Sequence, residues 1–126
     1  RTIASIPMGT DGFSGNFPAV AVLVGDLAAY FDERDRHVIY IDGALSAMTF
    51  MFALQTEGIS SCPINWPDIA DREKAIRKAI ELQPGERVIM YISFGYARAD
   101  GLVPSSVKKP LDHVRSYNQV ITQRRK

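Results

Sequence analysis

The sequence predicts an α+β fold, with two strands and two main helices in one chain of 126 residues. Two short apolar runs that end at a glycine, residues 19–24 and 87–94, have the length and composition of strands covered on both faces. Two longer segments, 38–57 and 68–82, have the apolar content and spacing of helices. With 46% apolar residues, the chain is typical of a globular protein with a single domain at 1–126.

The first strand is expected to follow a glycine-rich loop at residues 9–18. Three glycines can surround a phosphate, but the loop lacks the lysine and Ser/Thr of a P-loop, so a turn-rich connection is favoured. After the strand, Asp26 is placed to cap a short helical turn at 27–31. A charged loop at 32–36 then leads to the long apolar segment.

The segment 38–57 is apolar around nearly its whole circumference, so we expect a helix buried on most faces. A membrane span is the alternative interpretation. Asp42, Gln55 and Glu57 leave too short an uninterrupted run for a bilayer of about 30 Å, which favours a core helix and no membrane. One small domain cannot easily cover such a helix, which indicates a partner surface. Gly58 is expected to end the helix.

The second half of the chain begins with an expected loop at 59–67, followed by a helix that Asp68 would cap. The turn Pro84-Gly85 precedes the second strand, and an irregular stretch then extends to Pro110, where a short helix is expected. The apolar face of the helix at 68–82 would consist of Ile69, Ile76 and Ile80.

The charge balance excludes some classes of partner. Fifteen basic and fourteen acidic residues give a formal charge of +1, which argues against nucleic acid, because phosphate backbones require a concentrated basic surface. The basic run at 124–126 is expected to be a solvated terminus. Cys62 is the single cysteine, so the chain has no internal disulfide and fits a reducing, cytoplasmic compartment. We expect it to be a small buried thiol.

No signal peptide is expected before the domain, and the given sequence starts at Arg1 without an initiating methionine. A fragment, a processed chain and a trimmed chain would all look like this.

No conventional catalytic or metal-binding group is apparent. His37 and His113 lie in polar surroundings without a cysteine or carboxylate at ligand spacing, so both are expected to be exposed and no metal is expected. Asp42 is expected to interact with the helix dipole. Hydrolysis and acyl transfer therefore have no support, whereas an enzyme whose reactive atoms belong to a cofactor needs no such residues.

Four short motifs occur in an order that resembles the C-terminal half of the nitroreductase family. They are a strand after a proline, a long helix followed by Gly-Ile-Ser-Ser-Cys-Pro-Ile-Asn-Trp-Pro at 58–67, a strand ending Ser-Phe-Gly-Tyr at 93–96, and Lys-Lys-Pro-Leu-Asp at 108–112. The resemblance covers residues 18–115. It implies a central sheet flanked by helices, with a long buried core helix that packs against its mate in a homodimer. Two bound FMN molecules would lie at that interface.

The resemblance also implies which residues contact the flavin ring. The backbone at Pro63, Ile64, Asn65 and Trp66 would face its N5 and O4 edge, and an N–H aimed at N5 would stabilise the reduced ring. Pro63 has no N–H to donate. Trp66 stands where the family has glycine, so its side chain would reshape the acceptor pocket. The alternative is a rigid connection in which Trp66 is a packing anchor.

The resemblance further implies that the side chains of Lys108 and Lys109 bind the FMN phosphate. Lys108 stands where the family commonly has an arginine, and lysine can bind phosphate as a point charge without a bidentate fork. Ser106 replaces a second basic residue. The alternative is that both lysines are merely exposed residues before a helix.

The function implied is that of an FMN-dependent oxidoreductase, which passes hydride from NAD(P)H to a small-molecule acceptor such as a nitroaromatic or a quinone. The chain lacks the family's Arg-Arg-Ser-x-Arg and Ser-x-x-Asn-x-Gln-Pro stretches, so it contains only part of a flavin site. The alternative is a non-catalytic flavin-binding or dimerisation module of the same fold. Relatives that dehalogenate tyrosines or cleave reduced flavin are a third possibility.

Overall fold

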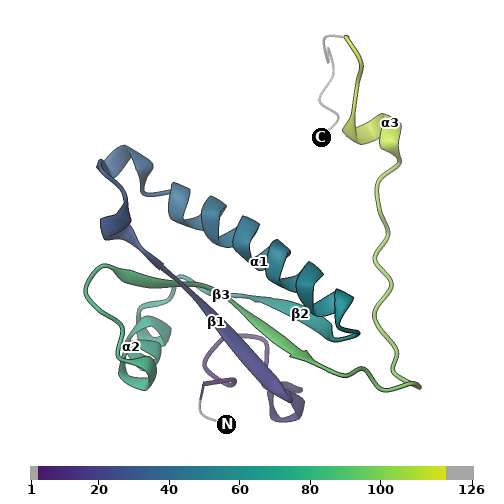
Figure 1. Cartoon of the computed structure of the whole chain (residues 1–126), viewed down its shortest axis with the longest axis horizontal. Helices are drawn as coiled ribbons and strands as arrows, with labels where there is room; N and C mark the ends of the chain where they lie inside the picture. Colours follow the sequence, from purple (N-terminus) through teal and green to yellow (C-terminus); the bar gives the residue numbers. More distant parts are fainter. Residues whose placement is uncertain (1–2, 119–126) are drawn as a thin grey trace.

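A computed structural model of the chain, which describes residues 3–118, contains an antiparallel three-stranded sheet with one helix on each face (Figure 1). The strand order is β1-β3-β2, so β3 is the central strand. Short 3-10 turns occur at Ser14–Asn16, Leu27–Ala29 and Glu33–Asp35. The main elements are β1 (Ala19–Asp26), α1 (Val38–Thr56), β2 (Ser60–Asn65), α2 (Ala70–Ile80), β3 (Glu86–Gly95) and α3 (Leu111–Val114).

The α+β class is confirmed, but the sheet has a third strand where the sequence predicts a loop. β2 pairs with β3 so that Ile64 lies opposite Tyr91 and Cys62 lies opposite Ser93. Of the six residues in β2 only Ile64 is buried, so the segment lacks the apolar alternation that predicts a strand. Its conformation follows from pairing with β3, which is the tertiary context that often decides strand formation.

The main core lies between the sheet and α2. Ile76 on α2 and Tyr91 on β3 are both fully buried there. Side chains from the N-terminal segment, including Ile6, close the same cluster. Its other buried members are Ile64, Trp66 and Val88.

α2 is shorter than predicted, since it begins at Ala70 and ends at Ile80. Ile69, not Asp68, is the residue at its N-terminal boundary, and no side chain caps it there. Glu81 ends the helix in a left-handed conformation with φ of 54°. The expected apolar face is therefore only partly correct: Ile76 is buried, whereas Ile69 precedes the helix and is exposed.

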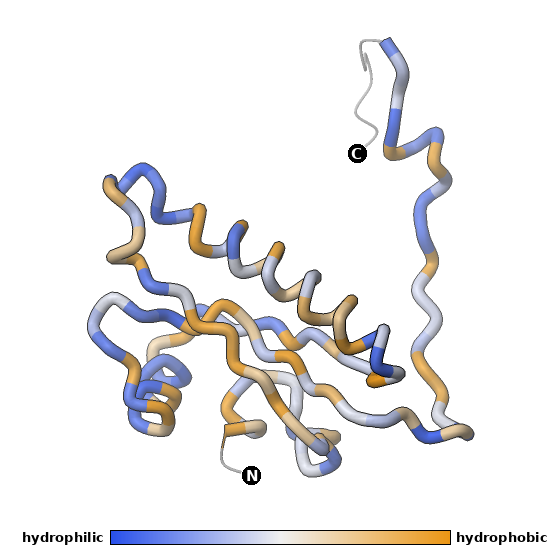
Figure 2. Tube along the Cα trace, viewed as in Figure 1, coloured by the Kyte–Doolittle hydropathy of each residue, from blue (hydrophilic) through white to orange (hydrophobic). Residues whose placement is uncertain are grey.

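The bounds predicted for α1 are nearly those observed, and Gly58 follows it with φ of +70°, as expected for a left-handed end. Its burial differs from the prediction. Only one face packs on the sheet, through Ile39, Ala47 and Leu54, because the described residues supply no second layer on its other side. Figure 2 shows apolar residues recurring along the whole helix.

By length and composition, Glu33–Thr56 is also able to cross a membrane, with a mean hydropathy of 1.4 and 17% of its most apolar window buried. The mostly buried core helix of a soluble protein passes the same test of length and composition, so the finding does not by itself indicate a membrane span.

β1 is an edge strand and is half-buried along most of its length, so the prediction that both its faces are covered is wrong for this chain. Asp26 does cap the following turn as predicted, because its carboxylate accepts a hydrogen bond from the Ala28 amide at 2.9 Å.

Beyond β3 the chain forms an extended arm, residues 96–118, in which every residue is exposed. Figure 1 shows this arm standing clear of the sheet, with α3 near its far end. The short helix after Pro110 is confirmed as α3. The basic run at 124–126 lies outside the described residues.

Candidate functional site

β2 is the edge strand on one side of the sheet, since no further strand pairs with it among residues 3–118. On an antiparallel edge strand, every second residue directs its N–H and C=O away from the neighbouring strand. Ile64 and Asn65 are adjacent, so one of their two N–H groups points to the open side, and Pro63 offers none. The edge of β2 is therefore a short row of fixed backbone donors and acceptors.

The side chains of β2 alternate between the two faces of the sheet. Ile64 enters the core beneath the sheet, whereas Pro63 and Asn65 are exposed. Cys62 is exposed as well, so the prediction of a buried thiol is wrong. By alternation along the strand, the Cys62 side chain lies on the same face of the sheet as Ile64. The core cluster between the sheet and α2 does not include Cys62.

Trp66 follows β2 directly and is a packing anchor. Its side chain is 8% exposed and its ring stacks on Tyr91, with centroids 5.5 Å apart and 16° between the ring planes. Its indole N–H donates a hydrogen bond to the Glu73 carboxylate. The side chain therefore lies in the core, and the expectation that it reshapes an acceptor pocket is wrong.

Lys108 and Lys109 lie on the exposed arm, just before α3. Neither forms an ion pair within the described part of the chain. The arm does not fold back over the sheet (Figure 1), so the fold of this chain alone does not bring the two lysines together with the edge of β2.

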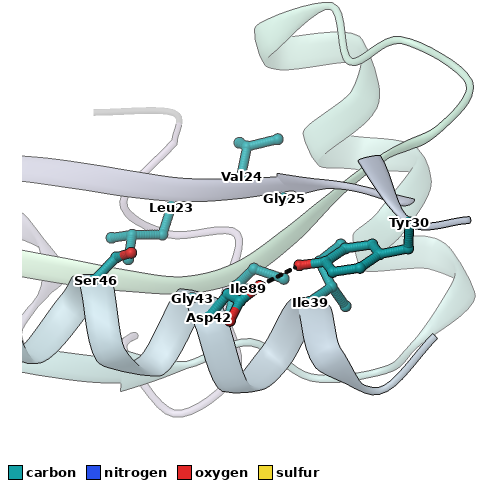
Figure 3. A pocket seen from close by; sticks show the side chains of 9 residues that line it. All are labelled: Leu23, Val24, Gly25, Tyr30, Ile39, Asp42, Gly43, Ser46 and Ile89. Carbon is teal, nitrogen blue, oxygen red and sulfur yellow. Dashed lines mark hydrogen bonds between the residues drawn. The ribbon is translucent and has the colours of Figure 1, made fainter. Parts of the chain in front are cut away.

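A hollow of about 220 Å³ lies elsewhere, between α1 and the end of β1 (Figure 3). Two glycines allow the close approach of helix and sheet at its floor. A Cβ atom on Gly43 would lie 2.7 Å from the Ile89 side chain, and one on Gly25 would lie 2.4 Å from Ile39. No residue of β2 or of the arm lines this hollow, so it is separate from the predicted flavin positions.

The polar groups of the hollow are Tyr30, Asp42 and Ser46. The Tyr30 hydroxyl donates a hydrogen bond to the Asp42 carboxylate at 2.8 Å, and this bond raises the pKa of Tyr30 above its ordinary value. Asp42 lies beyond the first turn of α1, so the predicted interaction with the helix dipole is wrong. Sequence reasoning did not single out Tyr30, because the pair joins residues 12 positions apart with no local pattern.

Both histidines are exposed, as predicted. In residues 3–118 no group of three His, Cys, Asp or Glu side chains is arranged to hold a metal ion.

Comparisons with solved structures find several proteins of similar fold. An FMN-dependent nitroreductase from Clostridium difficile is similar with a TM-score of 0.72 and 20% identity, over 94% of this chain and 68% of that one. A chain from Bacteroides thetaiotaomicron, provisionally named an NADH dehydrogenase or NAD(P)H nitroreductase, has a TM-score of 0.71 and 20% identity over 94% of this chain. This chain spans 65% of the length of that one.

A third structure is the FMN-dependent nitroreductase NfnB from Mycobacterium smegmatis, solved in complex with NADPH. It has a TM-score of 0.59 and 25% identity, over 85% of this chain and 45% of that one. No curated protein sequence matches the chain at a significant level. A sequence model described as the nitroreductase family matches residues 5–96, which include the whole sheet, α1 and α2. The chain therefore belongs to the nitroreductase family.

Proposed function

We propose that this chain is part of an FMN-dependent oxidoreductase that passes hydride from NAD(P)H to a small-molecule acceptor such as a nitroaromatic or a quinone. The single observation that most supports this function is the family match over residues 5–96. Two solved proteins of similar fold are described as FMN-dependent nitroreductases, and one of them was solved with NADPH. FMN, when bound, supplies the hydride-carrying atom, which explains why the chain needs no conventional acid, base or nucleophile.

The open edge of β2 is the proposed place of the flavin ring. Either Ile64 or Asn65 directs its N–H outward there, and Trp66 follows beyond the paired residues. A backbone donor in a paired strand is fixed in direction before any ligand binds, which is the property that makes such donors effective for developing negative charge. Exposed Pro63 would border the ring without donating.

The phosphate of FMN is proposed to bind Lys108 and Lys109. Both side chains are exposed and have no acidic partner within the described part of the chain, so their charge is available to an anion. Because the arm stands clear of its own sheet, the lysines would join a flavin at β2 only after the arm docks against another surface. A second copy of the chain is the partner that we propose.

α1 offers such a second copy a continuous apolar surface. Leu45 and Phe52 are 65% and 61% exposed, and Ile41 and Met48 lie on the same side of the helix. This stripe is proposed to pack against its equivalent across a twofold axis, giving a homodimer. Met51, which we also predict at the contact, is half-buried against its own chain and would lie at the margin.

A dimer contact of this kind buries well over about 1,000 Å². The dimer contact would cover the apolar surface of α1 without a membrane. We therefore propose that the protein is cytoplasmic. In that reducing compartment the exposed Cys62 would stay reduced.

A non-catalytic flavin-binding or dimerisation module is the second candidate. It is favoured by the separation of Lys108 and Lys109 from β2 within this chain. Steady-state oxidation of NADPH with menadione as acceptor, after reconstitution with FMN, distinguishes the two. FMN-dependent turnover supports the oxidoreductase, whereas bound FMN without turnover supports the inert module.

A further inference from the structure

A buried polar cluster lies directly beneath the end of β2. Trp66, the only tryptophan in the chain, stacks on Tyr91 and donates its indole N–H to Glu73 on α2. Tyr91 is fully buried and lies opposite Ile64 in the strand register. The cluster therefore connects the edge strand, the central strand and α2 at one point.

This contact is well placed to control the orientation of the strand end. β2 is held by a neighbouring strand on one side only, and its last paired residue is Asn65. α2 starts four residues after Trp66 and has no side-chain cap at its beginning. The hydrogen bond from Trp66 to Glu73 thus joins the first turn of α2 to the residue that follows the strand.

Two atoms of the cluster have no hydrogen-bond partner within the described part of the chain. They are Glu73 Oε2 and the Tyr91 hydroxyl, and both are buried. Native proteins leave few buried polar atoms unpaired. A carboxylate oxygen accepts and a tyrosine hydroxyl donates, so the two unpaired atoms are complementary in hydrogen-bonding chemistry.

We propose that Glu73 is a positioning residue for the flavin edge of β2. By accepting the hydrogen bond of Trp66, it fixes the indole against Tyr91 and with it the backbone direction at Asn65 and Trp66. This inference rests on the proposed function, because it assigns a purpose to the orientation of those N–H groups. Glu73 is half-buried on α2, its carboxylate points toward the core, and it is not proposed to touch the flavin.

The experiment compares three variants of the protein. Glu73→Leu removes the acceptor, Glu73→Gln keeps a carbonyl oxygen for the indole, and Lys78→Ala is a control at an exposed position of the same helix. The measurements are the fluorescence of Trp66 without flavin, the FMN dissociation constant, and the midpoint potential of bound FMN at saturating FMN.

Glu73→Leu is expected to shift the Trp66 emission and to weaken FMN binding about tenfold, since it leaves a buried indole N–H without an acceptor. The midpoint potential should become more negative, because misdirected N–H groups stabilise the reduced flavin less. Glu73→Gln should restore all three properties, and Lys78→Ala should change none. If Glu73→Leu does not fold, Trp66→Phe removes the donor while keeping the stacked ring, and the same loss of affinity and potential is expected.

The proposal is overturned if the wild type binds FMN and Glu73→Leu binds it with unchanged affinity and potential. It is also overturned if affinity falls while the potential at saturation stays that of the wild type, which would be a purely structural effect. Failure of the wild type to bind FMN at all would instead refute the proposed function, and the positioning role with it.

Discussion

The hydroxyl of Tyr30 donates a hydrogen bond to the carboxylate of Asp42 at 2.8 Å, and this contact ties the turn after β1 to the second turn of α1 (Figure 3). One residue further along the helix, Gly43 faces Ile89 on β3. The helix is therefore held against the sheet both by a polar contact at the rim of the hollow and by a close backbone approach at its floor.

Gly43→Ala is expected to destabilise the protein by about 1–3 kcal/mol, the usual cost of inserting a methyl group into a filled core. The new Cβ would lie 2.7 Å from the Ile89 side chain, so α1 or Ile89 must move. Urea unfolding of wild type and variant measures the difference. Gly12→Ala is the matched control, because a Cβ there meets nothing within 4 Å. Equal stability of both variants would mean that α1 does not approach β3 as described.

Tyr91 makes stability depend on pH in the alkaline range. Burial raises the pKa of Tyr91 to about 12 from 10.0, so between these values the unfolded state loses the proton first. The stabilisation is complete below pH 10 and is lost as the pH rises toward 12. We expect Tyr91→Phe to reduce the fall in unfolding free energy between pH 9 and pH 11, measured by urea denaturation. An identical fall in wild type and variant would show that Tyr91 ionises normally in the folded protein.

The length of α1 could be predicted from the sequence, because its apolar run is continuous and Gly58 marks its end. Its exposure could not, since a sequence shows which residues are apolar but not whether another surface covers them. β2 was missed because Ile64 is its only buried side chain. The Trp66–Glu73 contact was missed because it depends on where the chain turns between a strand that was not predicted and α2.

The candidate site was accessible to sequence reasoning only through resemblance. The proposed contribution to flavin binding comes from backbone groups, which leave no pattern of side-chain chemistry in the sequence. The side chains at these positions accordingly have nothing in common: Pro63, Ile64, Asn65 and Trp66. The Tyr30–Asp42 pair, by contrast, depends on the tertiary packing of α1 beside the turn after β1.

Leu45→Asp should dissociate the proposed dimer. It places a charge in the middle of the exposed apolar stripe of α1, where pairing with the same face would desolvate it. Because Leu45 is 65% exposed in the single chain, the variant should remain folded, with an unchanged far-ultraviolet circular dichroism spectrum. Sedimentation at micromolar concentration should show a monomer for the variant and a dimer for the wild type. Ala79→Asp, on the exposed side of α2, is the control. A dimer that survives Leu45→Asp would place the interface elsewhere.

Lys108→Glu should weaken FMN binding steeply. At an effective dielectric constant near 20, a like-charge contact at 4 Å costs about 4 kcal/mol, and solvent around the exposed arm reduces this value. Titration of the apoprotein, followed by flavin fluorescence, measures the change. Lys78→Glu changes the charge equally on α2 and should leave the affinity unaltered. Unchanged affinity of Lys108→Glu would show that the lysine before Pro110 is an ordinary surface residue.

The central claim is that a dimer of this protein binds FMN at the edge of β2. Its most direct test is gel filtration after incubation with FMN, with the protein and the flavin followed by absorbance. We expect flavin absorbance to elute with the protein at the size of a dimer. Protein that elutes as a monomer without flavin absorbance would contradict both the proposed dimer and the proposed flavin site.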